Sequence, residues 1–152
     1  IRRQLEDSTL IARHLGQVEQ VICAAPAYLQ AQGTPSAIAD LHQHRCLAYR
    51  LAEHPGRWQL EGPEGQTRLE LPVHFAVDNS LLLGDMLVAG LGIGALPGFV
   101  AQPLLDSGQL LRVLPEQRLP SRQIYALYPS QRHLSQKVRV FIDFLVEALQ
   151  TP

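Results

Sequence analysis

Short apolar runs alternate with helically spaced segments along this chain. β-Branched and alternating apolar residues predict strands at 18–24, 46–49, 73–77, 93–96, 110–114 and 124–128. Residues 58–60 and 67–71 predict a hairpin, because clusters of Gly and Pro flank them. The strand–helix–strand alternation of the middle and end of the chain favours an α/β fold with a largely parallel sheet.

The segments between these strands have helical spacing. Pro26 suits the first turn of a short helix that ends at Gly33, and we expect Ser36 to cap a second short helix. Further helices are predicted over 82–90, from Pro103 to near Gly108, and over 135–149. The last of these carries one apolar stripe, made of Val138, Phe141, Ile142, Leu145 and Leu149.

Composition narrows the class of protein. A length of 152 residues, 46% of them hydrophobic, predicts one domain, divided at most into lobes, with a sizeable core. A net charge of −1 argues against a domain that holds DNA alone by neutralising phosphates. No apolar run approaches the roughly 18 residues of a membrane span. Two cysteines are too few for a disulfide scaffold, so we expect a cytoplasmic protein.

Two motifs suggest chemistry that their context does not support. The glycines of 90–94 follow a helix and precede a strand, the reverse of the order that a dinucleotide fingerprint requires. His42, His44 and Cys46 could converge on a metal, but structural zinc needs four ligands and no second cluster lies nearby. A helix stop and satisfied histidines are the favoured interpretations, so neither metal nor cofactor is expected. With no Gly-x-Ser-x-Gly elbow and no paired carboxylates, no catalytic residue is predicted and we expect no enzyme.

The junction at Asp78, Asn79 and Ser80 is the most informative local feature. A strand ends there and a helix begins, and the first N–H groups of a helix carry partial positive charge. A small anion could dock at these groups, helped by the hydroxyl and amide side chains. The alternative is an ordinary helix cap. Arg2 and Arg3 could likewise hold a carboxylate, or form a solvated surface pair.

Taken in order, a series of short motifs resembles one family. The motifs are Ile1-Arg2-Arg3, Asp7 to Leu10, Ala12-Arg13, Cys23 to Leu29, Gly33-Thr34-Pro35, Asp40-Leu41, His44 to Leu47, Trp58, Asp78-Asn79, Ala89 to Ile93, Leu96-Pro97, Gly108 to Leu110, Tyr125 to Pro129, Arg132 to Ser135 and Lys137 to Leu145. Together they resemble the effector-binding domain of LysR-type transcriptional regulators. Their order and spacing carry the resemblance, which covers nearly the whole chain.

The resemblance implies a periplasmic-binding-protein-like (type 2) fold, with two lobes, a small-molecule cleft and two hinge strands. By analogy, residues 1–19 end the first lobe and form a hinge, 20–122 form the second lobe, and 123–152 return to the first lobe as a hinge strand and a helix. We expect the chain to be a fragment that lacks most of the first lobe and a winged helix-turn-helix. The resemblance also implies homodimers or tetramers, with DNA bound only through the missing winged helix.

The family's second-lobe effector contacts lie where a strand meets the following helix, which here means Asp78, Asn79 and Ser80. Arg2 resembles a hinge-side position that can face the cleft, and Ala25 and Tyr125 lie near the expected hinges. The resemblance therefore implies a small-molecule effector, a small carboxylate or an aromatic compound. No membrane partner is implied.

Three functions compete at this point. The first is the effector-sensing and oligomerisation domain of a bacterial transcription regulator. The second is a free-standing solute-binding protein, which an upstream signal peptide in place of a winged helix would reveal. The third is a small α/β enzyme, which would need a catalytic set that the sequence does not show. In the first case the apolar stripe of the last helix should be covered, either by the rest of the chain or by a neighbouring chain.

Overall fold

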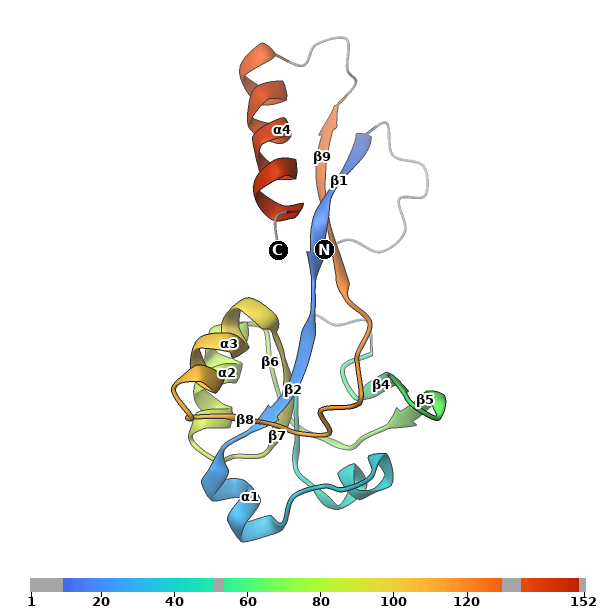
Figure 1. Ribbon diagram of the computed structural model, residues 1–152, viewed down its shortest axis with the longest axis vertical. Coiled ribbons are helices and arrows are strands. Elements are labelled where there is room, and N and C mark those ends of the chain that lie inside the picture. The colour runs from blue at the N-terminus through green and yellow to red at the C-terminus, as the bar shows by residue number, and fades with distance from the viewer. Residues whose placement is uncertain (1–9, 51–53, 130–134, 151–152) are drawn as a thin grey trace. The chain divides into compact units, whose positions relative to one another are not determined.

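The computed structural model describes residues 10–50, 54–129 and 135–150 (Figure 1). The chain forms two compact units, each with its own hydrophobic cluster. Residues 19–120 form one, which we call the sheet unit. Residues 1–18 and 121–152 form the other, which we call the ribbon unit. Arg2 and Arg3 lie outside the described residues.

A five-stranded mixed sheet organises the sheet unit. Its order is β6-β3-β7-β2-β8, with β2 at Gln20–Ala24, β3 at Cys46–Tyr49, β6 at Val73–Val77, β7 at Ile93–Pro97 and β8 at Leu111–Arg112. β3 runs parallel to β6 and β7, but β2 is antiparallel to β7 and β8. The expectation of a largely parallel sheet is therefore wrong for β2. The alternation of strands and helices carries no information on the direction of a strand that enters the sheet from another unit.

Helices and a hairpin cover the two faces of this sheet. The helices are α1 at Pro26–Gln32, the 3-10 helix η1 at Ile38–Gln43, α2 at Ser80–Val88 and α3 at Gly98–Asp106, and the hairpin strands are β4 at Arg57–Gly62 and β5 at Gly65–Glu70. α2 and α3 lie side by side in Figure 1, and Gly84 of α2 faces Val100 and Leu104 of α3. The predicted hairpin is confirmed.

Two predicted helix boundaries are wrong. α3 begins at Gly98 and contains Pro103, because burial of Val100 and Ala101 offsets the one backbone hydrogen bond that proline removes. Ser36 does not cap the second helix. Instead the Asp40 carboxylate accepts hydrogen bonds from Ser36 and from the Ala37 N–H, which hold the pKa of Asp40 below its usual range.

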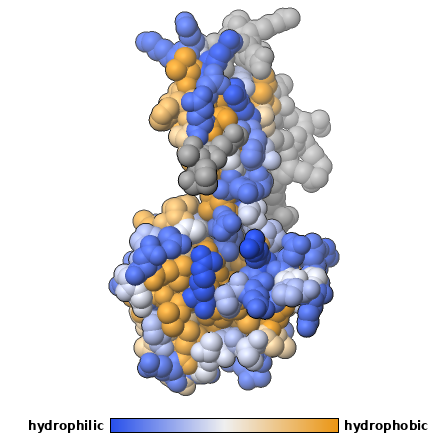
Figure 2. Space-filling view, viewed as in Figure 1, coloured by the Kyte–Doolittle hydropathy of each residue, from blue (hydrophilic) through white to orange (hydrophobic). Residues whose placement is uncertain are grey.

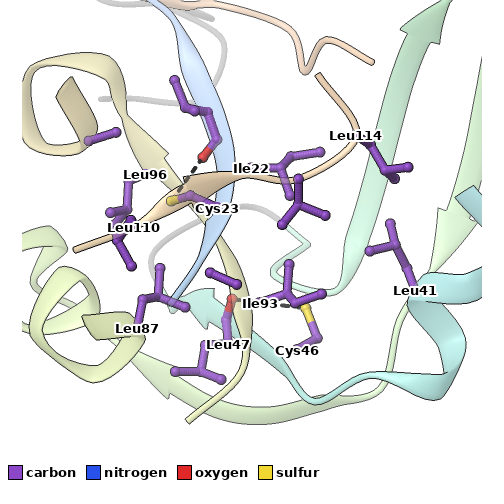
Figure 3. Packing of buried hydrophobic residues seen from close by; sticks show 14 of the residues in the cluster. Ile22, Cys23, Leu41, Cys46, Leu47, Leu87, Ile93, Leu96, Leu110 and Leu114 are labelled. Atoms are coloured by element: carbon purple, nitrogen blue, oxygen red, sulfur yellow. Dashed lines mark hydrogen bonds between the residues drawn. The ribbon is translucent and has the colours of Figure 1, made fainter. Parts of the chain in front are cut away.

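The two cysteines lie on opposite faces of the sheet. Cys23 pairs with Gly94, whose α-carbon faces Leu87 of α2. Cys46 pairs with Ile93, the neighbour of Gly94 on β7, and successive residues of a strand point to opposite faces. Figure 3 shows the two thiols in separate layers of the core. Both are buried, so each side of the sheet excludes water from a thiol.

Burial should make both thiols unreactive in the folded chain. It raises the pKa of Cys23 to about 12 and that of Cys46 to about 11, against an ordinary value of 9.0, because the thiolate is poorly solvated there. We expect a disulfide reagent at pH 8 to label neither thiol until denaturant is added. Because the folded pKa values are raised, their contribution to stability is present below pH 9 and is lost as the pH rises through 11 to 12. Rapid labelling of either thiol without denaturant would contradict this.

Glycines set how closely β3 and β7 approach. Gly90 has φ +75° and ends the helical segment, as glycine does without strain. A Cβ on Gly92 would overlap the Arg45 carbonyl oxygen, and one on Gly94 would lie 3.0 Å from the Leu47 carbonyl oxygen. The glycine-rich stretch is therefore a helix stop followed by tight strand packing, as its position after a helix predicts.

Gly92→Ala should lower the free energy of unfolding by roughly 1–3 kcal/mol, because backbone must shift to admit the methyl group. Gly84→Ala is the matched control. Its methyl group would meet Leu104 at an ordinary 3.4 Å, and alanine favours a helix interior by about 1 kcal/mol over glycine. Urea unfolding measures both. Equal stability of the two variants would show that the strand approach is not tight.

The ribbon unit is a two-stranded antiparallel ribbon covered by one helix. It consists of β1 at Leu10–Val18, β9 at Arg122–Pro129 and α4 at Gln136–Gln150. The hydrophobic pattern did not predict β1, because its apolar residues do not alternate regularly and a register shift lies between His14 and Gly16. The resemblance alone had placed the end of a lobe and a hinge in residues 1–19. Arg13 of β1 and Asp143 of α4 form an ion pair at 2.7 Å.

The apolar stripe of α4 is only partly covered in this chain. Ile142 is buried against Leu15 and Tyr128, and Leu145 packs beside them. Phe141 is 59% exposed and Phe144, one turn along, is 61% exposed. Figure 2 shows apolar surface beside hydrophilic residues in the part of the molecule that contains α4. Among the described residues, no helix has the length and apolar content to cross a bilayer.

Candidate functional site

The parallel strands place their carboxyl ends at one edge of the sheet. Tyr49, the last residue of β3, pairs with Val77, the last residue of β6. The Arg50 N–H then donates to the Val77 carbonyl oxygen at 2.7 Å, which holds the following residues of both strands together. β7 ends at this edge with Pro97. In open α/β sheets, ligands bind beyond the carboxyl ends of strands.

Asn79 is the N-cap of α2. Its Oδ1 accepts hydrogen bonds from the N–H groups of Leu81 at 2.8 Å and Leu82 at 3.3 Å, and its carbonyl oxygen accepts one from Leu83. The ordinary cap that the sequence suggested is therefore present. It occupies two of the N–H groups that an anion would otherwise use. The side chain of Ser80 makes none of the hydrogen bonds found among the described residues, so its hydroxyl can contact a ligand.

Asp78 faces Arg50 from the neighbouring strand end. Arg50 Nη2 lies 3.3 Å from Asp78 Oδ2, and the side chains are 64% and 58% exposed. An ion pair this exposed adds little to stability, because water screens it. It does hold a guanidinium on Asp78, two residues before the Ser80 that begins α2. Sequence reasoning missed Arg50, although its position directly after the predicted strand at 46–49 is a signal that could have identified it.

A second helix begins at the same edge. α3 follows Pro97 and has no side-chain cap, but the Gly98 N–H donates to the Glu19 carbonyl oxygen at 2.9 Å, so this N-terminus offers an anion one N–H group fewer. Its second residue, Phe99, is exposed, as are Leu81 and Leu82 in the first turn of α2. The edge thus combines a hydroxyl, a guanidinium and apolar side chains with two helix N-termini whose N–H groups are in part already hydrogen-bonded. These are groups that suit a small carboxylate with an apolar body.

Two further predicted residues, Ala25 and Tyr125, lie on other elements of the chain. Ala25 follows Ala24, which pairs with the first residue of β7, so it lies at the opposite edge of the sheet and is buried. Tyr125 belongs to the ribbon unit, where its ring packs edge-on against His14 with centroids 5.4 Å apart. Within the sheet unit, Asp78, Asn79 and Ser80 lie together, and Ala25 lies apart from them.

Of the two histidines near Cys46, His44 takes part in the packing of the sheet unit. The Tyr28 hydroxyl oxygen accepts a hydrogen bond from the Arg45 N–H at 3.0 Å, and the same hydroxyl is hydrogen-bonded to Nδ1 of His44 at 3.2 Å. His44 is buried, whereas His42 is exposed on η1. The described part of the chain holds no group of three or more residues that could bind a metal ion.

Asn79→Ala should lower the free energy of unfolding by about 1 kcal/mol, because two N–H groups of α2 lose their acceptor. Asn79→Asp keeps an oxygen at the cap and should restore most of the loss. Thermal or urea unfolding distinguishes the two variants. An alanine variant as stable as the parent would mean that water replaces the cap at no cost.

Comparison with known proteins identifies the family. The family model described as the LysR substrate binding domain matches residues 1–150. The chain is 35% identical over 144 residues to the HTH-type transcriptional activator AaeR of Escherichia coli, covering 94% of this chain and 46% of that protein. It is 31% identical over 147 residues to the HTH-type transcriptional regulator CrgA of Neisseria meningitidis, covering 96% and 49% respectively. The chain thus spans about half the length of these relatives.

Solved structures agree with this identification. The regulatory domain of CrgA, a LysR-type transcriptional regulator from Neisseria meningitidis, matches with a TM-score of 0.82 at 31% identity, covering 97% of this chain and 72% of that one. The fold is therefore that of LysR regulatory domains, mixed α/β and periplasmic-binding-protein-like, as the sequence predicts. The chain belongs to the LysR substrate-binding domain family.

Proposed function

We propose that this chain is the effector-sensing part of a LysR-type transcriptional regulator. The match of the family model to residues 1–150 carries the proposal, and the relatives it resembles are transcriptional regulators. Those relatives favour a regulator over a free-standing solute-binding protein. The sheet unit would be the second lobe and the ribbon unit the end and return of the first. Because a transcription regulator acts on DNA inside the cell, the proposal places the chain in the cytoplasm.

The proposed effector site is the sheet edge at Asp78, Asn79 and Ser80, extended to Arg50. The Ser80 hydroxyl and the Arg50 guanidinium suit a carboxylate, and the exposed Leu81, Leu82 and Phe99 suit an apolar or aromatic body. Asn79 acts there by holding α2 in place, since its oxygen is already engaged. Ala25 is not part of this proposal, because it lies at the opposite edge.

The effector works in this proposal by favouring one arrangement of the two units. A ligand shifts such an equilibrium only by its difference in affinity for the two arrangements, typically about 1–3 kcal/mol. Arg2 and Tyr125 remain candidates for contacts from the first lobe. The regulator would bind DNA through its winged helix and assemble as a dimer or tetramer, with the exposed apolar residues of α4 covered in the assembly.

A thermal-shift screen of the intact regulator against small carboxylates, aromatic acids and amino acids tests the proposal. A ligand that binds the folded state stabilises it by mass action, so the shift reports the ligand class. Ser80→Ala should weaken the shift and the transcriptional response by about tenfold in ligand concentration, as loss of one hydrogen bond to a charged group implies. DNA affinity should not change.

Thr67→Ala is the matched control, because Thr67 is an exposed hydroxyl residue on β5 of the same unit. It should leave the shift as in the parent. If Ser80→Ala and Arg50→Gln both respond as the parent does to a ligand that shifts it, the site lies elsewhere.

A further inference from the structure

The chain passes between its two units twice, and the two crossings are built differently. At the first, only Glu19 separates β1 from β2. Its carbonyl oxygen accepts a hydrogen bond from the Gly98 N–H at 2.9 Å. At the second, residues 115–120, which we call the return segment, lead from the core of the sheet unit towards β9. The first crossing has a single residue outside the strands, so only the second has several residues that could change their conformation.

Main-chain hydrogen bonds hold the return segment on the hairpin. The Glu61 N–H donates to the Arg118 carbonyl oxygen at 2.9 Å, and the Arg118 N–H donates to the Glu61 carbonyl oxygen at 2.8 Å. Upstream, the Val113 N–H donates to the Ile22 carbonyl oxygen at 2.9 Å. The segment thus adds one short bridge to β4, and a separate bond anchors the chain just before it.

Two features of the attached state are unfavourable. Leu114 has φ +50°, and it alone of the described non-glycine residues has a positive φ. The residue before a proline is also restricted to extended conformations, and Pro115 follows it. In addition, Oε1 of Gln117 is buried without a hydrogen-bond partner among the described residues. Release of the segment would let Oε1 of Gln117 reach water and would free the chain that follows Leu114, whose own side chain is buried in the core.

The contact with the hairpin depends on a glycine. A Cβ on Gly62 would overlap the terminal amide atoms of Gln117. Gly62 closes β4 opposite Gly65, and its φ is not in the left-handed region, so its own conformation admits alanine. The missing side chain at Gly62 leaves the space that the Gln117 amide fills, and alanine there would displace this flexible amide from its place against the hairpin.

We propose that the return segment is a two-state strap that sets how freely the two units move. Attached to β4 at Arg118, it leaves three residues, 119–121, before β9 begins at Arg122. Released as far as Leu114, it leaves seven residues, 115–121. The role that we give to the strap rests on the proposed sensing function, because a sensor must change how its two units are coupled. Its two states are a property of this chain with or without an effector.

Amide hydrogen exchange measured by NMR on the 152-residue chain tests the strap. The Glu61 and Arg118 amides should exchange at least about tenfold faster than the Val113 amide, because the strap opens locally while the core stays closed. Gly62→Ala should raise the exchange of Glu61 and Arg118 about tenfold further and leave Val113 unchanged. Adding Gln117→Ala to that variant removes the overlapping amide and should restore the parent rates within about threefold.

Gly84→Ala is the control, since it adds a methyl group to the same unit away from the strap. The proposal is overturned if Glu61, Arg118 and Val113 exchange at one rate in the parent, because the strap then opens only with the whole unit. It is equally overturned if Gly62→Ala changes nothing, if it accelerates Val113 in parallel, or if Gln117→Ala does not rescue it. An absence of thermal shifts with any effector would contradict the sensing function and leave these exchange results unaffected.

Discussion

The close approach of β3 and β7 is the constraint on which the sheet unit depends. Gly92 and Gly94 leave room for the carbonyl oxygens of Arg45 and Leu47. The two parallel strands therefore approach so closely that a side chain at either glycine would meet the backbone of β3 or of the residue before it. That pairing fixes β6 on the far side of β3 and brings three strand ends to one edge. Because α2 and α3 both begin there, their N-termini and the side chains of their first turns share one surface. The candidate site is thus a result of strand packing.

Much of this fold could be predicted because local signals agree with it. The alternation of Val73, Phe75 and Val77, the Gly and Pro clusters around Trp58 and the helical spacing after Asn79 each specify an element that forms. The misses have physical causes. The direction of β2 depends on where the chain enters the sheet, β1 lacks regular alternation, and the packing of α3 overrides the tendency of Pro103 to end or begin a helix.

The site was harder to predict than the fold. Asp78, Asn79 and Ser80 could be singled out because a cap motif followed a strand, but the sequence could not show that the cap uses its own helix's N–H groups. Arg50 and Phe99 come from other strand ends, and only the sheet order brings them to the same edge. The resemblance had grouped Ala25 with Asp78, Asn79 and Ser80. The antiparallel direction of β2 places Ala25 at the opposite edge of the sheet.

The placement of the cysteines also limits what oxidation can do to this protein. β7 lies between β2 and β3, so the two thiols belong to strands about 9–10 Å apart and point away from each other. A disulfide needs α-carbons within about 7 Å, so the folded chain cannot cross-link to itself. A bond between Cys23 and Cys46 would require the sheet to come apart first. Oxidative damage would therefore trap molecules that have already unfolded and would spare the intact fold.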